Sequence, residues 1–157
     1  MADSKRQDIV DLIVAAMQGI DGTGSYQTTV GSNVTDWGLN FQEDELPAIS
    51  VCDLQDDIAD DGQGAGYGEV FDLHRLNVRI RISVRADARA AECRKMLADV
   101  VTAVRGNQYW NNGTSNLALK TDLKGTRFVL DEEKFVIAAA EAEIDVFYRT
   151  QVLNAYQ

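Results

Sequence analysis

Residues 75–85, RLNVRIRISVR, alternate between apolar side chains and arginine, asparagine or serine. Residues 136–150, VIAAAEAEIDVFYRT, continue the same alternation with Glu141, Glu143 and Asp145 on the polar side. Period-two patterns of this length predict two long strands, each with one buried face. If the strands are neighbours, an arginine row lies beside a carboxylate row, where each opposite-charge pair contributes up to roughly 1 kcal/mol. We expect this face of the sheet to make protein contacts rather than to catalyse a reaction.

The composition predicts one soluble domain spanning residues 1–157. A chain of 157 residues can bury roughly two-thirds of its unfolded surface. No apolar run approaches the roughly 20 residues of a membrane span, and the N-terminus lacks the separate regions of a signal peptide. We therefore expect the protein to stay in the compartment where it is made. The formal net charge of −10 argues against general binding to nucleic acid.

The two cysteines, Cys52 and Cys93, lie in apolar surroundings, one in a strand candidate and one on the buried face of a helix candidate. Two cysteines in a chain without a signal peptide give weak support for a disulfide and too few ligands for a zinc site. We expect both to be reduced thiols in the core.

Two segments have the apolar spacing of amphipathic helices. The first begins at a cap, Asp3 or Ser4, and ends at Gly19 or Gly22, whereas the second begins at Asp87 and ends at Gly106. Short strand candidates lie at residues 28–30, 34–37, 48–54, 117–121 and 127–130. The first two of these suggest a small hairpin or irregular edge strands, and Pro47 opens the third. This order predicts an α+β fold, a mixed or antiparallel sheet with two main helices packed on one face.

Residues 55–69, QDDIADDGQGAGYGE, are rich in aspartate and glycine and predict a mobile loop. As an EF-hand starting at Asp57, the loop would put Ala59 and Gly68 where oxygen ligands are required, so we expect no specific calcium site. The simpler interpretation is a solvated loop that becomes ordered against a partner. Residues 153–157 form a short C-terminal tail.

The sequence supplies no catalytic constellation. His74 is the only histidine, and no serine or cysteine nucleophile is near it in the sequence, so catalysis would need spatial partners that the sequence does not show. Glu141 and Glu143 share a strand face and could perform acid and base work, but the neighbouring arginines favour ion pairs. Neither a P-loop nor a dinucleotide motif is present. We expect no catalytic, cofactor-binding or metal-binding residue.

Several segments together resemble one family. The opening helix ends in Gly-Ile-Asp-Gly, and Val-Thr-Asp-Trp and Glu-Leu-Pro-Ala-Ile-Ser-Val follow. After the acidic loop and the arginine strand come a helix with Ala-Asp-Val-Val-Thr-Ala-Val and a final strand ending Val-Phe-Tyr-Arg-Thr. The layout resembles the tail terminator proteins of long-tailed bacteriophages and is similar to the related tail-completion and head–tail joining proteins. Residues 46–49 and 148–150 are the strongest pieces of the resemblance.

The resemblance implies an α+β structural subunit that forms a hexameric ring on the head-proximal end of the tail tube. The ring stops tube polymerisation and offers a docking surface to the neck. Its partners would be other copies of the chain, the tube protein and the neck or head–tail connector proteins. It would be found in the virion, and in the host cytoplasm during assembly.

The hypothetical interface residues fall into charged and aromatic groups. The ring needs heterologous contacts, and these are the residues we expect to supply them: Arg75, Arg79, Arg81, Arg85, Glu141, Glu143, Asp145, Asp56, Asp57, Asp60, Asp61, Tyr67 and Trp110. Whether the charged rows pair within one subunit or between two stays open. Tyr67 and Trp110 are either lids on the core or anchors for a partner, whereas we expect Trp37 in the core.

Three alternatives remain. Another neck component, such as a tail-completion or connector protein, shares the small α+β format and differs in its effect on tail length. A small enzyme would use His74 with acidic partners. A nucleic-acid-binding regulator would use the arginine strand against the opposing net charge.

Overall fold

The computed structural model describes residues 4–38, 41–58, 71–85, 90–130 and 137–151. Within these ranges five strands form one sheet with the order β1-β2-β3-β5-β4. The strands are β1 (Val34–Asp36), β2 (Ala48–Ile58), β3 (Phe71–Arg85), β4 (Ala118–Leu130) and β5 (Ile137–Gln151). β1 is parallel to β2, and the other neighbouring pairs are antiparallel. The predicted α+β fold with a mixed sheet is confirmed.

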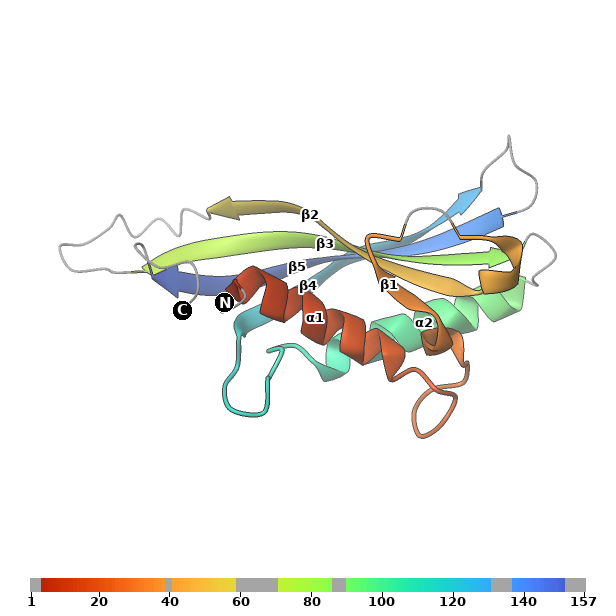
Figure 1. Ribbon diagram of the computed structural model, residues 1–157, viewed down its shortest axis with the longest axis horizontal. Helices are drawn as coiled ribbons and strands as arrows, with labels where there is room; N and C mark the ends of the chain where they lie inside the picture. Colours follow the sequence, from red (N-terminus) through yellow and green to blue (C-terminus); the bar gives the residue numbers. More distant parts are fainter. Residues whose placement is uncertain (1–3, 39–40, 59–70, 86–89, 131–136, 152–157) are drawn as a thin grey trace.

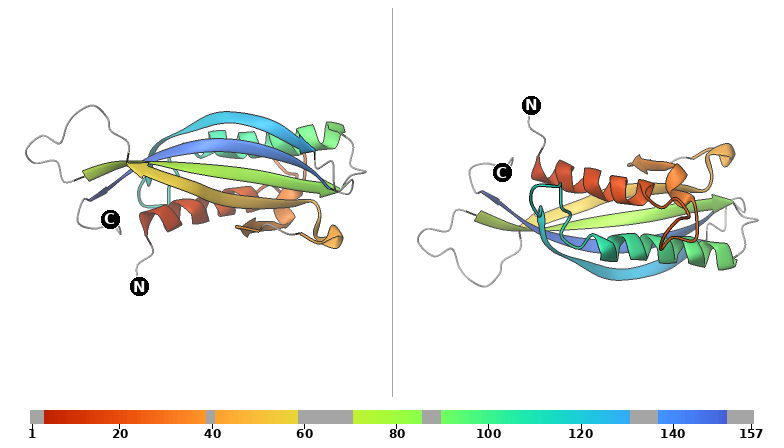
Figure 2. Two further views of the ribbon diagram at one scale, coloured as in Figure 1. Left: turned by 90° about the horizontal axis from the view of Figure 1, so that it is seen from above. Right: turned by 90° about the horizontal axis from the view of Figure 1, so that it is seen from below.

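Two helices, α1 (Lys5–Gln18) and α2 (Ala90–Gly106), lie on the same face of the sheet (Figure 1). Figure 2 shows both helices against the strands in one view and the uncovered strands in the other. The covered face holds the core, because alternate residues of β3 and β5 point toward the helices and are buried. These core residues are Leu76, Val78, Ile80 and Ile82 of β3, which pair with Val146, Ile144, Ala142 and Ala140 of β5.

Local signals set the ends of α1. The Ser4 hydroxyl accepts a hydrogen bond from the Gln7 N–H at 3.2 Å, so Ser4 is the N-cap. Gly19 is the C-cap, and its N–H donates to the Ala15 carbonyl. The predicted caps are confirmed at these two positions, while the alternative cap Asp3 and the predicted cap Asp87 of the second helix lie outside the described residues.

Two backbone segments pack closely where a 3-10 turn, Val30–Ser32, meets the end of α1. The Gly31 N–H donates to the Ile20 carbonyl at 3.0 Å. A Cβ atom on Gly31 would lie only 2.3 Å from the Met17 carbonyl oxygen, well inside van der Waals contact. Only glycine fits this approach of two backbone segments.

A buried carboxylate joins α2 to the segment that follows α1. Asp99 is only 3% exposed. Its oxygens accept hydrogen bonds from the N–H groups of Gln27 and Thr28, at 3.1 and 2.8 Å, and from the Thr28 hydroxyl at 2.7 Å. Charge-assisted bonds of this kind are stronger than neutral ones, so Asp99 fixes the loop against the helix.

The strand predictions need three corrections. The two candidates at 117–121 and 127–130 are one continuous strand, β4, because bulges near Leu119 and Lys124 interrupt its alternation. The candidate at 48–54 continues to Ile58, so the predicted loop at 55–69 begins at least four residues too early; its remaining residues lie outside the described ranges. Of the two alternatives for residues 28–37, the hairpin is wrong and an edge strand is confirmed at Val34–Asp36, where the short parallel strand β1 follows a 3-10 turn.

Both cysteines are buried and free, as predicted. Burial raises the pKa of the Cys93 thiol, which disfavours the reactive thiolate. No helix in the described part of the chain is long and apolar enough to cross a membrane.

Candidate interaction surface

The face of the sheet opposite the helices is here named the open face. It consists of the odd-numbered residues of β3 and β5 together with the register-matched residues of β2 and β4 (Figure 2). Its basic residues outnumber its acidic ones, although the whole chain has a net charge of −10. The register places on it the basic residues Arg75, Arg79, Arg81, Arg85, Lys120, Lys124, Arg127 and Arg149, and the acidic residues Asp57, Asp122, Glu141, Glu143 and Asp145.

The predicted pairing of the arginine and carboxylate rows occurs within one chain. Arg79 lies opposite Glu143 and Arg81 opposite Glu141 in the β3–β5 register. The closest charged contact between the rows is diagonal, since Arg79 Nε lies 3.8 Å from Glu141 Oε2. The question that the sequence left open is answered for these two strands: they are neighbours in the same subunit.

The buried carboxylates have closer basic partners on β4 than on β3. Glu141, with a side chain 7% exposed, accepts a 2.7 Å hydrogen bond from Arg127 Nε. Asp145 lies 3.5 Å from Lys124 Nζ and accepts a bond from Asn77 Nδ2, which also donates to Glu143. Sequence reasoning missed these β4 partners because the bulge at Lys124 shifts them out of the alternating pattern.

The arginines keep binding capacity on this face. The Nε atoms of Arg79 and Arg81 are buried and have no hydrogen-bond partner among the described residues. Both arginines line a cleft together with the carboxylate of Glu141, and Trp37, Ser50 and Cys52 complete its wall. Buried polar atoms without partners carry a cost of about 1–3 kcal/mol, so an acceptor entering this cleft would be stabilised.

The outer arginines have partners at the two ends of the open face. Arg75 donates to Asp57 at 3.0 Å, and Asp57 also accepts from Gln55. These two hydrogen bonds, first that from Gln55 and then that from Arg75, lower the pKa of the Asp57 carboxyl. At the other end, the Arg85 guanidinium donates to the Glu43 carbonyl at 3.1 and 3.2 Å. Arg75 and Arg85 therefore make contacts at the two ends of the open face and do not line the cleft.

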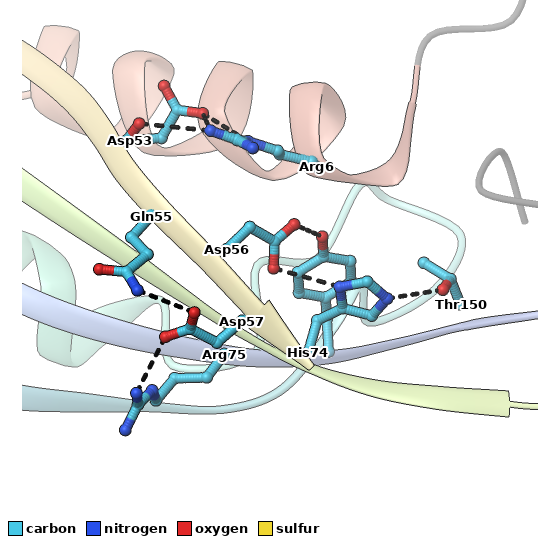
Figure 3. Close-up of polar contacts among 9 residues, drawn as sticks. Arg6, Asp53, Gln55, Asp56, Asp57, His74, Arg75 and Thr150 are labelled. Atoms are coloured by element: carbon cyan, nitrogen blue, oxygen red, sulfur yellow. Dashed lines mark hydrogen bonds and ion pairs between the residues drawn. The ribbon is translucent and has the colours of Figure 1, made fainter. Parts of the chain in front are cut away.

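A polar cluster lies on the covered side of the sheet near the first turn of α1 (Figure 3). His74 Nδ1 lies 3.1 Å from Asp56 Oδ1, and His74 Nε2 lies 2.9 Å from the Thr150 hydroxyl. The Tyr148 hydroxyl donates to the other oxygen of Asp56 at 2.5 Å, and its ring stacks on His74 with centroids 4.7 Å apart. Three strands, β2, β3 and β5, are tied together by this cluster.

The polar cluster lies at the end of the sheet that the helices do not cover (Figure 1). β3 and β5 have 15 residues each and α1 has 14, which correspond to about 50 Å of strand and about 21 Å of helix. The strands therefore extend beyond the helices (Figure 1), and hydrogen bonds replace apolar packing at their ends. Asp56, His74 and Thr150 are hydrogen-bonded in the sequence acid, histidine, hydroxyl that a nucleophile triad has. However, the Asp56 carboxylate also accepts from Tyr148, and Thr150 is only 6% exposed. We interpret the cluster as a structural contact that holds the three strands together.

Tyr148→Phe is expected to remove one source of alkaline sensitivity. Burial, followed by the hydrogen bond to Asp56, raises the pKa of Tyr148 far above its ordinary value of 10.0. As the pH rises, the tyrosine hydroxyl therefore loses its proton in the unfolded chain before it does so in the folded protein. The contribution of Tyr148 to the free energy of unfolding is complete below about pH 10 and falls by up to about 1.4 kcal/mol per pH unit above it. Urea unfolding at pH 7, 10 and 11 measures this. The variant should lose about 1 kcal/mol at pH 7 and show a shallower alkaline decline; an unchanged decline would contradict the assignment.

The remaining predicted interface residues have separate outcomes. Asp56 belongs to the polar cluster on the covered side and Asp57 to the end of β2, so neither lies in a loop. Polar residues can lie in a strand here because neighbouring strands supply their partners. His74 of β3 and Tyr148 of β5 contact Asp56, and Arg75 of β3 contacts Asp57. Asp60, Asp61 and Tyr67 lie outside the described residues, as do the other positions of the rejected calcium loop. The described residues include no group of three or more His, Cys, Asp or Glu side chains arranged to hold a metal ion.

The structure decides between the two alternatives for Trp110 and contradicts the prediction for Trp37. Trp110 is 2% exposed and donates from Nε1 to the Thr121 hydroxyl at 2.9 Å, so it is a core residue and not a partner anchor. Trp37, predicted to be in the core, is 47% exposed at the β2 edge, where its Nε1 donates to Asp53. Both residues have a positive φ, a turn conformation that local composition did not reveal.

No protein-family model matches this sequence, and no curated protein matches it either.

Proposed function

We propose that this chain is a structural subunit of a bacteriophage tail, a tail terminator that forms a hexameric ring on the head-proximal end of the tail tube. The ring stops tube polymerisation and presents a docking surface to the neck. The proposal rests on the sequence resemblance and on one structural observation, the open face, whose basic excess contrasts with the acidic chain.

The charge distribution supports binding to acidic protein surfaces. The chain has a net charge of −10, so the surface outside the open face is more acidic than the average. A second copy therefore presents negative charge to the cleft lined by Arg79 and Arg81. Complementary potentials of this kind speed encounter and fix orientation. The buried Nε atoms of the two arginines supply donors for an incoming carboxylate.

Three of the segments that carry the resemblance lie where the chain enters or leaves its main elements. Residues 46–49 lead into β2, and residues 148–150 lie near the end of β5. Gly-Ile-Asp-Gly follows α1 directly. These positions fit a shared subunit fold whose contacts with other proteins are made by the open face and its edges. In this proposal the protein needs no cofactor, carries out no turnover, and binds neither membrane nor specific nucleic acid.

Disruption of this reading frame in the genome that encodes it is expected to yield tail tubes of uncontrolled length. The physical reason is that a tube without its terminal ring keeps a polymerisation-competent end. Tube lengths in lysates are measured by electron microscopy, and the wild-type frame supplied from a plasmid should restore normal lengths. Normal-length tails left unattached to heads would instead assign the chain to a tail-completion or connector protein. Normal, attached tails would contradict a role in the tail.

A matched pair of plasmid variants tests the open face in the same assay. Replacing Arg79 and Arg81 with glutamine removes both positive charges of the cleft and keeps the side chains polar. Arg105→Gln, on the exposed surface of α2, removes a charge that does not line the cleft. The double variant should fail to restore tube length while Arg105→Gln restores it. Equal restoration by both would show that the cleft is not the contact.

A further inference from the structure

Large exposed apolar side chains gather along the two edges of the sheet. On the β2 edge they are Trp37, Leu54 and Ile58, and on the β4 edge they are Tyr109, Leu119 and Phe128. Among the described residues only one further large apolar side chain is comparably exposed, Phe71 at the start of the inner strand β3. Six such residues on two edges form a pattern, whereas single exposed apolar residues would need no explanation.

The outer edge of β4 is long and unpaired. Its first residue, Ala118, donates its N–H to the Tyr109 carbonyl at 3.0 Å. Beyond Ala118, as far as Leu130, no strand of the described chain pairs with this side of β4. An edge of this length offers a row of backbone donors and acceptors to another strand. α2 lies beneath the sheet on this side and does not lie along the edge (Figure 2).

The outer edge of β2 is closed at one end and open at the other. β1 pairs with residues 49–51 only. The next carbonyl groups are also engaged, since the Trp37 N–H donates to Val51 O and the Arg6 guanidinium donates to Asp53 O. From Leu54 to Ile58 no strand of the described ranges lies on the outer side. Ile58, at 68% exposed, marks this open end.

Strand direction makes the two edges compatible. β2 and β3, β3 and β5, and β5 and β4 are each antiparallel, so β2 and β4 run in opposite directions. When a second copy is placed beside the first in the same orientation, its β2 is antiparallel to the first copy's β4. The alternation of the sheet then continues across the boundary. Such a contact joins two different patches, and repeated by rotation it closes into a ring.

We propose that the outer edge of β4 pairs with the open end of β2, residues 54–58, in a second copy of this chain. The apolar residues of the two edges pack against one another beside the new hydrogen bonds. This proposal rests on the proposed ring and names the surface through which the ring is built. It differs from the cleft on the open face, which lies on the sheet surface rather than along its edge.

Single lysine substitutions on the edges test the contact. Leu119→Lys blocks the β4 edge and Ile58→Lys blocks the β2 edge, because a charge on an edge strand opposes pairing. Leu119 is chosen because the register of the sheet sets the start of β4 level with the end of β2. Ala15→Lys is the control, since Ala15 is exposed on α1 and lies on neither edge of the sheet. Circular dichroism confirms that each variant is folded. Analytical ultracentrifugation from about 1 to 100 μM should show that the wild type and the control associate. In both edge variants the association constant should be at least tenfold lower.

Mixing the two edge variants identifies the partners. Each variant keeps one good edge, so a head-to-tail contact predicts one-to-one heterodimers in the mixture and no larger species. A symmetric β4–β4 contact predicts that Ile58→Lys dimerises alone, and that result would overturn the proposal. Wild-type protein that stays monomeric at all concentrations, or edge variants that associate like the wild type, would also overturn it.

The edge contact and the proposed function can fail separately. Overgrown tubes after frame disruption, combined with unaffected association of the edge variants, would retain the terminator function and remove this contact. Normal attached tails, combined with one-to-one heterodimers in the mixture, would retain the contact and remove the function.

Discussion

Replacement of Asp99 with alanine is expected to lower the free energy of unfolding by about 3 kcal/mol or more. The carboxylate holds the N–H groups of Gln27 and Thr28 and the Thr28 hydroxyl. Each buried donor left without a partner costs about 1–3 kcal/mol, and alanine satisfies none of them. The segment after α1 should detach from α2. Urea denaturation monitored by circular dichroism measures the loss.

Two further substitutions make the Asp99 result specific. Asp99→Asn keeps one acceptor oxygen and should lose about half as much, since one amide oxygen satisfies only part of the set. Asp122→Ala, on the open face with a side chain 47% exposed, should change stability by no more than about 0.5 kcal/mol. A loss below about 1 kcal/mol for Asp99→Ala would mean that water or a rearranged loop replaces the carboxylate.

Trp110→Ala is expected to cost about 3–5 kcal/mol, the range for a buried large aromatic side chain. The indole fills the space beneath the start of β4, and its Nε1 hydrogen bond to Thr121 links the turn to the strand. Removal leaves a cavity, and the Thr121 hydroxyl keeps only its donation to the Gln108 carbonyl. The variant should unfold at a clearly lower urea concentration than the wild type.

Trp110→Phe and Tyr109→Ala separate packing from position. Phenylalanine keeps much of the apolar volume and loses the Nε1 bond, so it should be less destabilising than alanine. Tyr109, the neighbour in sequence, is 51% exposed, and its replacement should be nearly neutral. Equal losses at positions 109 and 110 would show that the turn, and not the buried indole, determines the effect.

The centre of the sheet was predictable from sequence because alternation alone defines it. From Leu76 to Val84 the apolar residues face the helices and the polar residues face the other side, so polarity alternates without interruption and burial alternates as far as Ile82. The helix ends were predictable for the same kind of reason, since Ser4 and Gly19 act through local backbone chemistry.

The margins of the sheet were not predictable, because non-local contacts decide them. Gln55, Asp56 and Asp57 have the composition of a loop, but β3 and β5 supply His74, Arg75 and Tyr148 as partners. β4 was divided in two because its bulges break the pattern. Strand propensity depends on such context more than helix propensity does.

The candidate surface was predicted in part. The arginine and carboxylate rows were identified, and their adjacency is confirmed. The closest basic partners of the carboxylates are Lys124, which lies in a bulge, and Arg127, which follows it, and no alternating pattern includes a bulge. Trp37 was misplaced and Trp110 was left between two alternatives because both lie in or next to turns, where sequence periodicity does not indicate which way a side chain points.

The single histidine makes the polar cluster an internal spectroscopic probe. Because His74 is the only imidazole in the chain, its two ring nitrogens give signals that need no assignment by mutation. One nitrogen faces Asp56 of β2 and the other Thr150 of β5, so a nitrogen-15 spectrum reports the alignment of three strand ends at once. Any event that bends the projecting end of the sheet, including incorporation into a larger particle, would be visible as a change in two resonances.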